Sequence, residues 1–151
     1  MSLAVRPILH RTGVRFRRRG ESLRLPASST GDLIRRIEQG LSFKALHSLA
    51  SVSGLPVPVL ASLVGIPGRT LARRKAAGRL APEESERLLR ISTVFELAVE
   101  LFEGDVAAAI DWLTAPKKAL GGNAPLAYAR TELGAREVEA LIGRLEHGVF
   151  S

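Results

Sequence analysis

The sequence predicts an all-α protein, and three observations lead to this fold class. Apolar residues recur at helical spacing along most of the chain after residue 30, whereas strand-like alternation never extends beyond four residues. Prolines stand where helices would begin, because a first helical turn does not need their missing N–H. Hydrophobic residues make up 46% of the chain but aromatic residues only 5%, so Leu, Val, Ile and Ala must form the core, which suits packed helices.

The elements follow from helical periodicity, caps and breakers. Pro58, Pro67 and Pro82 each fit the first turn of a helix. Gly54 closes the helix that precedes this glycine, and Asp105 can cap the helix that follows this aspartate. The first helix has Thr30 or Asp32 as its candidate caps. Helices are expected over 30–40, 42–53, 58–64, 67–77, 82–102, 105–113, 125–129 and 135–146.

Three segments result from this assignment. Residues 1–29 lack sustained periodicity and contain the run Arg17 to Arg19, so they are interpreted as a basic arm or linker. The run could lie against the phosphates of DNA, act as a targeting segment or be a plain tail, and these alternatives stay open. A first helical domain is expected at 30–102 and a smaller one at 103–151.

The net charge of +7 is unevenly distributed. Residues 1–26 hold seven Arg against one acid, and residues 67–90 hold seven cations against three acids. The rest of the chain is mildly acidic. Segregated positive charge suits a polyanionic partner better than a uniformly basic surface does. For either block alone, a solvated surface without a partner is the alternative.

The segment from Pro58 to Lys75 has the pattern of a helix-turn-helix. Two helices that cross through a tight turn need a small residue at the crossing and a residue tolerant of positive φ in the turn. Ala61 and Gly65 meet these needs. The second helix would expose its first turns to base edges, as such motifs do. The candidate DNA contacts are Arg69, Thr70, Arg73, Arg74 and Lys75.

Two features depart from the usual pattern of this motif. Arg74 stands where many such motifs place a third apolar anchor, and Gly68 stands where Ser or Thr often caps. An ordinary helical hairpin is therefore the alternative. Charge favours DNA binding, because neighbouring cations on one helix repel each other and a hairpin has little reason to gather them.

Catalysis and cofactor binding find no support in the sequence. The absence of cysteine excludes disulfides and thiolate chemistry. The three His residues stand apart from carboxylates at ligand spacing, and neither a nucleophile elbow nor a complete phosphate-binding loop occurs. We expect no enzyme, no catalytic residue, no metal and no cofactor. No apolar run approaches the roughly 18–20 residues that cross a bilayer, so no membrane partner is expected.

Two further sets of residues form an ordered pattern. The first is Leu63-Val64-Gly65-Ile66-Pro67, Arg69-Thr70-Leu71, Arg73-Arg74-Lys75, Gly78-Arg79-Leu80 and Pro82-Glu83-Glu84-Ser85. The second is Trp112-Leu113, Leu120-Gly121-Gly122, Pro125-Leu126, Thr131, Gly134-Ala135-Arg136, Val138, Leu141, Arg144 and Gly148. With them the chain resembles the Xre/MbcA/ParS antitoxins from Asp32 to Ser151. The second set is the more specific, because it follows the family's toxin-binding domain in order.

The resemblance implies a cytoplasmic type II antitoxin with two parts. The helix-turn-helix domain would bind the operator of its own operon and autoregulate transcription, and the C-terminal domain would block a RES-domain toxin, an enzyme that consumes NAD. Family members commonly form homodimers. The arm has no clear counterpart in the family. Expected toxin contacts lie in the Gly-rich loop, in the last expected helix and in the C-terminal tail: Lys117, Lys118, Gly121, Gly122, Asn123, Arg144, Val149, Phe150 and Ser151.

Two alternatives remain open at this point. The chain could be a toxin neutraliser whose helix-turn-helix no longer binds DNA, which the departures at Gly68 and Arg74 would favour. It could also be a DNA-binding regulator without a toxin partner. From the residues alone, Val149 and Phe150 could equally tuck into the core.

Overall fold

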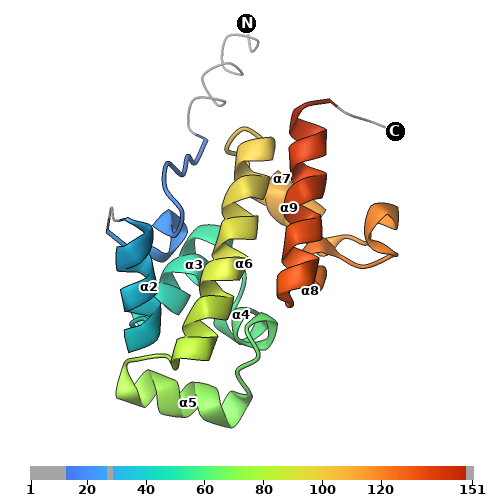
Figure 1. Ribbon diagram of the computed structural model, residues 1–151. Coiled ribbons are helices and arrows are strands. Elements are labelled where there is room, and N and C mark those ends of the chain that lie inside the picture. Colours follow the sequence, from blue (N-terminus) through green and yellow to red (C-terminus); the bar gives the residue numbers. More distant parts are fainter. Residues whose placement is uncertain (1–12, 27–28, 149–151) are drawn as a thin grey trace, which may run out of the picture.

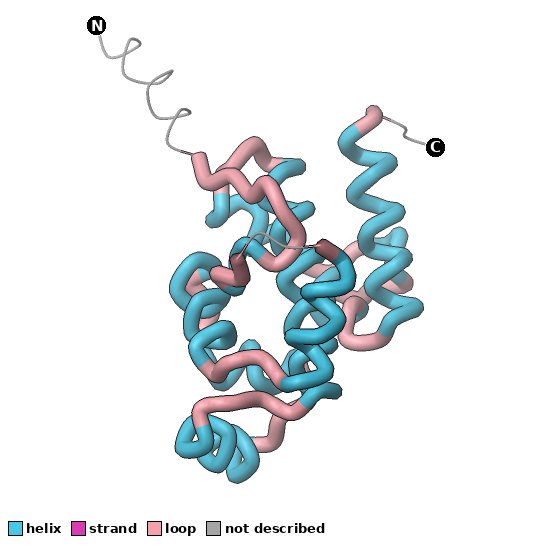
Figure 2. The backbone as a smooth tube through the Cα atoms, turned by 60° about the vertical axis from the view of Figure 1, so that its left-hand side comes forward, coloured by secondary structure: helices cyan, strands magenta, loops and turns pink. Residues whose placement is uncertain are grey.

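The computed structural model of the protein describes residues 13–26 and 29–148. This part of the chain forms eight α-helices and two short 3₁₀ helices, without a strand (Figures 1 and 2), so the all-α prediction is confirmed. The elements are η2 Glu21–Leu23, α2 Thr30–Gln39, α3 Lys44–Ser53, α4 Val57–Leu63, α5 Gly68–Ala77, α6 Pro82–Leu101, α7 Val106–Thr114, η3 Lys118–Leu120, α8 Pro125–Tyr128 and α9 Glu132–Glu146.

The longest helix, α6, runs through the middle of the molecule. Helix α2 and η2 pack against it on one side, and α7 and α9 pack on the other (Figure 1). One hydrophobic core therefore extends through both halves of the protein. The predicted domain boundary after residue 102 falls at the end of a helix that contacts both predicted domains. The core residues of α6 include Leu88, Ile91, Val94, Phe95, Ala98 and Val99.

Most helix ends follow the sequence signals. Asp105 caps α7, as expected, by accepting a hydrogen bond from the third residue of that helix. The cap of α2 differs from the prediction: it is Ser29, whose hydroxyl accepts the N–H of Asp32. Thr131 caps α9, which begins three residues earlier than expected.

Residues 13–26, expected to be part of the arm or linker, pack instead against α6. The ring of Phe16 lies 5.7 Å from that of Phe95. Leu23 is only 2% exposed. The carboxylate of Glu96 accepts hydrogen bonds from the backbone N–H groups of Gly20 and Ser22 and from the Ser22 hydroxyl. We call residues 13–26 the N-terminal segment.

A second connection joins the halves through Arg90 of α6. Its guanidinium donates a hydrogen bond to the carbonyl of Arg130, at 3.1 Å, and forms an ion pair with Glu132, at 3.4 Å. The neighbouring Gly134 has no room for a side chain, because a Cβ there would lie 1.7 Å from the carbonyl oxygen of Tyr128. These contacts fix the turn between α8 and α9 on the central helix.

Within the described residues, no single helix is long and apolar enough to cross a membrane. The helices α3 and α4 reach the required length and composition only when taken together, and they are bent by 111° relative to each other. Their apolar residues Leu46, Leu49 and Leu60 are buried in the core.

Candidate nucleic-acid interface

The turn between α4 and α5 is built as the sequence predicts. Gly65 adopts a φ of 75°, a left-handed conformation that suits glycine. The N–H of Ile66 donates to the carbonyl of Ala61 at 2.8 Å, which satisfies an otherwise unpaired group at the end of α4. Ala61 and Ile66 are both buried, so the turn is fixed by packing as well as by hydrogen bonds.

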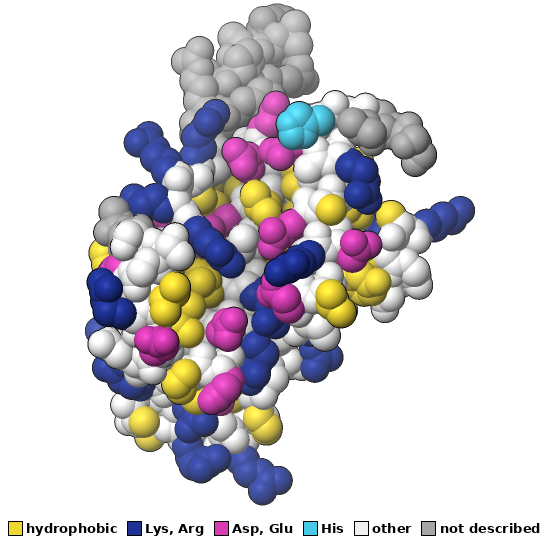
Figure 3. Space-filling view, viewed as in Figure 1, with side chains coloured by type: hydrophobic (Ala, Val, Ile, Leu, Met, Phe, Trp, Pro, Cys, Tyr) yellow, Lys and Arg dark blue, Asp and Glu magenta, His cyan; other side chains and the backbone are white. Residues whose placement is uncertain are grey.

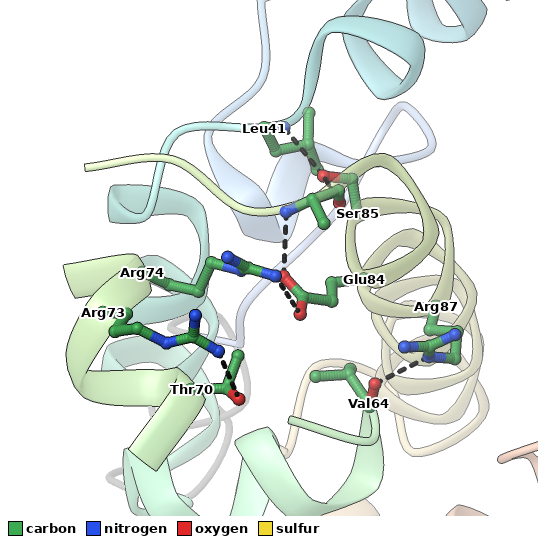
Figure 4. A network of polar contacts seen from close by, with 9 residues as sticks. Leu41, Val64, Thr70, Arg73, Arg74, Glu84, Ser85 and Arg87 are labelled. Atoms are coloured by element: carbon green, nitrogen blue, oxygen red, sulfur yellow. Dashed lines mark hydrogen bonds and ion pairs between the residues drawn. The ribbon is translucent and has the colours of Figure 1, made fainter. Parts of the chain in front are cut away.

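Arg87 of α6 attaches this turn to the body of the protein. Its Nε donates to the carbonyl of Val64 at 2.7 Å (Figure 4). The guanidinium lies close to Gly65, since a Cβ at that position would meet the Arg87 side chain at about 3.5 Å. The glycine thus gives the turn its conformation and leaves space for the arginine.

Helix α5 is held by an ion pair with α6. Arg74 donates to Glu84 through two nitrogens, Nε to Oε1 at 2.8 Å and the terminal NH2 nitrogen to Oε2 at 3.2 Å. The side chain of Glu84 is 8% exposed and that of Arg74 is 29% exposed. Such two-point pairing fixes orientation as well as distance. Glu84 also accepts the N–H of Ala81 and so caps α6.

The protonation of Glu84 follows from this setting. Burial alone would raise the pKa of its carboxyl, but the hydrogen bonds from Arg74 and from the Ala81 N–H outweigh burial and hold the pKa below its ordinary value. The same pair raises the pKa of Arg74, chiefly through the hydrogen bond to Glu84. Both groups are charged at neutral pH, and the pair stays intact.

The outer face of α5 is open. All residues of this helix are exposed or only partly buried. Arg69 and Arg73 are exposed one helical turn apart, and the Arg73 guanidinium reaches the Thr70 hydroxyl at 3.3 Å (Figure 4). Lys and Arg side chains gather at this end of the molecule, whereas most visible acidic side chains lie over other helices (Figure 3).

The structure therefore separates the five predicted DNA contacts. Arg69, Thr70 and Arg73 share one side of α5. Lys75 is exposed in the last turn but lies about 200° around the helix from Arg73, because successive residues advance by about 100°. Arg74 turns inward to Glu84 (Figure 4).

Two residues that position this site were not singled out from the sequence. Glu84 enters the sequence pattern only as part of Pro82-Glu83-Glu84-Ser85, and Arg87 only as one of the seven cations of residues 67–90. A signal for Glu84 was present, since it stands three residues after Ala81, the distance at which a glutamate caps its own helix. Its pairing with Arg74 depends on the tertiary packing of two helices.

The second predicted site, the Gly-rich loop of residues 117–123, is compact. The backbones of Lys117 and Asn123 pair, with the Lys117 N–H donating to the Asn123 carbonyl at 3.1 Å. Leu120 is 3% exposed and anchors the loop in the core. Gly121 and Gly122 both have positive φ, which lets the chain turn back. The backbone of this loop therefore has a fixed shape.

The loop lies beside α9, which carries the exposed Arg144. The ammonium of Lys117 sits 5.1 Å from the centre of the Trp112 ring, a cation–π distance that holds the lysine at the base of the loop. Lys118 is exposed. Val149, Phe150 and Ser151 lie outside the described residues.

Comparison with protein families matches both halves of the chain. Residues 32–92 match the antitoxin Xre-like helix-turn-helix domain. Residues 97–148 match the antitoxin Xre/MbcA/ParS C-terminal toxin-binding domain. The first match contains α5 with its candidate contacts, and the second contains the Gly-rich loop and α9.

Three relatives, each named "Antitoxin Xre", are similar over most of their length. The Yersinia enterocolitica protein is 45% identical over 128 residues, 84% of this chain and 86% of the relative. The Photorhabdus laumondii protein is 34% identical over 127 residues, 83% and 86% of the two chains. The Pseudomonas putida protein is 31% identical over 114 residues, which are 75% of this chain and 70% of the relative. These relatives are antitoxins, so the prediction of a binding protein and not an enzyme is confirmed.

Proposed function

This chain belongs to the Xre family of antitoxins, and from that premise we propose that it neutralises a RES-domain toxin and binds the operator of its own operon. The supporting observation is the pairing of an exposed basic helix, α5, with a C-terminal half that matches a toxin-binding domain. The RES toxin would be an enzyme that consumes NAD, and the antitoxin would act in the cytoplasm by binding it.

Helix α5 would enter the major groove of the operator. Arg69 and Thr70 lie in its first turn, where an arginine can bind guanine through two hydrogen bonds and a threonine can contact a thymine methyl group. Arg73 and Lys75 would meet phosphates. Arg74 would contribute charge but act mainly as a positioning residue, because its guanidinium is bound to Glu84. A homodimer would place two such helices about 34 Å apart on a palindromic site.

The C-terminal half would hold the toxin. The exposed part of the Gly-rich loop, at Lys117, Lys118, Gly121, Gly122 and Asn123, would form one side of the contact surface. Arg144 on α9 and the last residues, Val149, Phe150 and Ser151, would extend it. A loop of fixed shape supports this assignment, since a preformed surface loses little conformational entropy on binding.

The DNA half of the proposal is tested by the salt dependence of binding to the DNA upstream of the gene. Arg73→Ala should weaken binding and flatten the log–log dependence of affinity on salt by about 0.9 for each lost phosphate contact. Arg17→Ala is the matched control, since it removes the same charge from an exposed residue of the N-terminal segment. If the wild-type protein does not bind this DNA, the chain is a toxin neutraliser that does not bind its operator.

The toxin half is tested by coexpression with the neighbouring gene. Removing residues 148–151 should release toxicity, and replacing Lys118 and Arg144 with Glu should weaken the complex in a pull-down. Continued protection by the truncated protein would place the interface elsewhere. The absence of a RES-like gene beside this one would favour a regulator that has no toxin partner.

A further inference from the structure

An open cleft of about 680 Å³ lies between the N-terminal segment, α2, α3 and the residues that follow α5. We call it the basic cleft, because its lining among the described residues includes Arg24, Arg36, Lys44, His47 and Arg79 but no carboxylate. The four arginine and lysine residues come from four different parts of the chain. A cleft lined by one sign of charge concentrates its electrostatic field and attracts groups of the opposite sign.

The walls and floor of this cleft are fixed. The Arg79 guanidinium donates to the carbonyl of Gly40 at 2.7 Å, and Arg36 is paired with Asp32, one turn earlier on α2. On the floor, the N–H of Leu41 donates to the buried hydroxyl of Ser85 at 2.8 Å. The charged rim is therefore part of the folded structure.

Three of the four arginine and lysine residues in the cleft form no ion pair among the described residues, and of these three only Arg79 is bound to backbone carbonyls. Arg24 and Lys44 are exposed, and among the described residues neither side chain forms an ion pair with an acid. Each stands at a defined backbone position: Arg24 ends η2 with a φ of 60°, and Lys44 begins α3. Their charges are available to a ligand.

The basic cleft adjoins the C-terminal end of α5. Arg79 is the first residue after Gly78, which ends that helix. The N–H of Phe43, just before α3, donates to the carbonyl of Gly78 at 2.9 Å. Lys and Arg side chains also continue along the edge of the molecule between α5 and α2 (Figure 3). The cleft and the candidate base-reading helix thus belong to one continuous basic surface.

We propose that the basic cleft binds the phosphodiester backbone of the DNA whose major groove receives α5, with Arg24 and Lys44 as the contact residues. This inference rests on the proposed operator binding. A ten-residue helix is about 15 Å long, whereas the major groove is about 12 Å wide. The C-terminal end of α5 therefore reaches the edge of the groove, where the backbone runs and where the cleft lies.

The other basic block of the sequence provides an internal control. Arg17 and Arg18 lie on the same N-terminal segment as Arg24 and are exposed, but neither lines the basic cleft. Arg17 lines a hollow beside residues 102–106, at the far end of α6 from α5. Removing Arg17 and Arg18 therefore lowers the charge of the segment without changing the cleft.

The test measures binding to the upstream duplex by fluorescence anisotropy at several salt concentrations. The variant Arg24→Asn with Lys44→Gln removes two charges, and Asn is chosen because it tolerates the left-handed backbone of Arg24. The control, Arg17→Gln with Arg18→Gln, removes the same charge. The cleft variant should flatten the log–log salt slope by about 1 to 2, and the control should leave the slope unchanged.

Several results would overturn the inference. The first is a cleft variant that keeps the wild-type salt slope, and the second is an equal flattening of the slope in both double variants. The third is displacement of the DNA by inorganic phosphate at constant ionic strength, which would indicate a site for small anions. If the double variant melts early, Lys44→Gln alone should still flatten the slope by about 0.9. Arg73→Ala separates the two proposals: if it weakens binding and the cleft variants do not, only the cleft assignment fails.

Discussion

The two ends of α6 each bury a glutamate, and the protein holds the two carboxylates in different ways. Glu84, at the N-terminal end, is paired with the guanidinium of Arg74. Glu96, near the other end, is bonded to no cation of residues 13–26 or 29–148 and accepts hydrogen bonds from neutral donors of Gly20 and Ser22. Hydrogen bonds with Arg74 and the Ala81 N–H outweigh burial and lower the pKa of Glu84, whereas burial raises the pKa of Glu96.

The difference follows from what each end must hold. The Glu84 end secures a regular helix whose outer face is basic, so an acid that pairs with an arginine also compensates part of that charge. The Glu96 end secures the N-terminal segment at Gly20 and Ser22, whose backbone N–H groups bond to the carboxylate. A carboxylate is a strong acceptor for such groups, but without a cation it bears the full cost of burial.

Removing the Glu96 carboxylate, near the C-terminal end of α6, should have the largest effect on stability. Glu96→Ala leaves three buried donors of Gly20 and Ser22 unpaired, and each unpaired group costs about 1–3 kcal/mol. Partial rearrangement of the segment limits the loss, so we expect unfolding in denaturant to show a decrease of about 2–4 kcal/mol. Glu100→Ala, one turn further along α6 and exposed, is the matched control.

A loss below about 0.5 kcal/mol, the range of ordinary surface changes, would contradict this prediction. It would mean that the packing of Leu23 and Phe16, together with the hydrogen bonds of Val14 and Arg19, holds the N-terminal segment, and that the hydrogen bonds to Glu96 add nothing.

Neutralising Glu84, at the N-terminal end of α6, should affect the recognition of operator DNA more than the stability of the fold. In Glu84→Gln, Arg74 loses its charged partner, so α5 is less firmly oriented. The protein also gains positive charge, which strengthens sequence-independent attraction to DNA. We therefore expect operator binding to fall several-fold relative to binding of random DNA, with toxin binding unchanged. Competition assays with both DNAs measure this ratio.

The control for that experiment is Glu86→Gln, which makes the same charge change at an exposed position of the same helix. It should strengthen binding to both DNAs alike and keep their ratio. An unchanged ratio in the Glu84 variant would remove Arg74 from the positioning role.

The comparison also indicates what sequence reasoning can reach. The α4–α5 turn was predictable, because Ala61 and Gly65 act through local geometry. The early start of α9 was missed, since Gly134 weakens the helical signal of the first turn. That glycine is explained by Tyr128, whose carbonyl leaves no room for a Cβ.

Contacts between distant residues were beyond reach. Arg74 was recognised as a departure from the motif, but nothing local identifies Glu84 as its partner. Ser22 and Glu96 are 74 residues apart, and an irregular segment has no period that would place it in the core. Isolated side chains specify such contacts, and they do so only after the helices have packed.

The smallest expected effect is a pH dependence of the free energy of unfolding that is due to Glu96 alone. Its native pKa is raised above the unfolded value, so the native state takes up this proton first as the pH falls. Relative to Glu96→Gln, the wild type should therefore become more stable between pH 7 and pH 5, by at most about 1.4 kcal/mol per pH unit for one proton. Glu84 has the opposite sign: its stabilisation is lost only as the pH falls below the ordinary glutamate value of 4.5, outside this window. Melting curves of both proteins measure the difference, in which the histidines cancel. A gap that stays constant from pH 7 to pH 5 would mean that Glu96 is held without the cost of burial assigned to it.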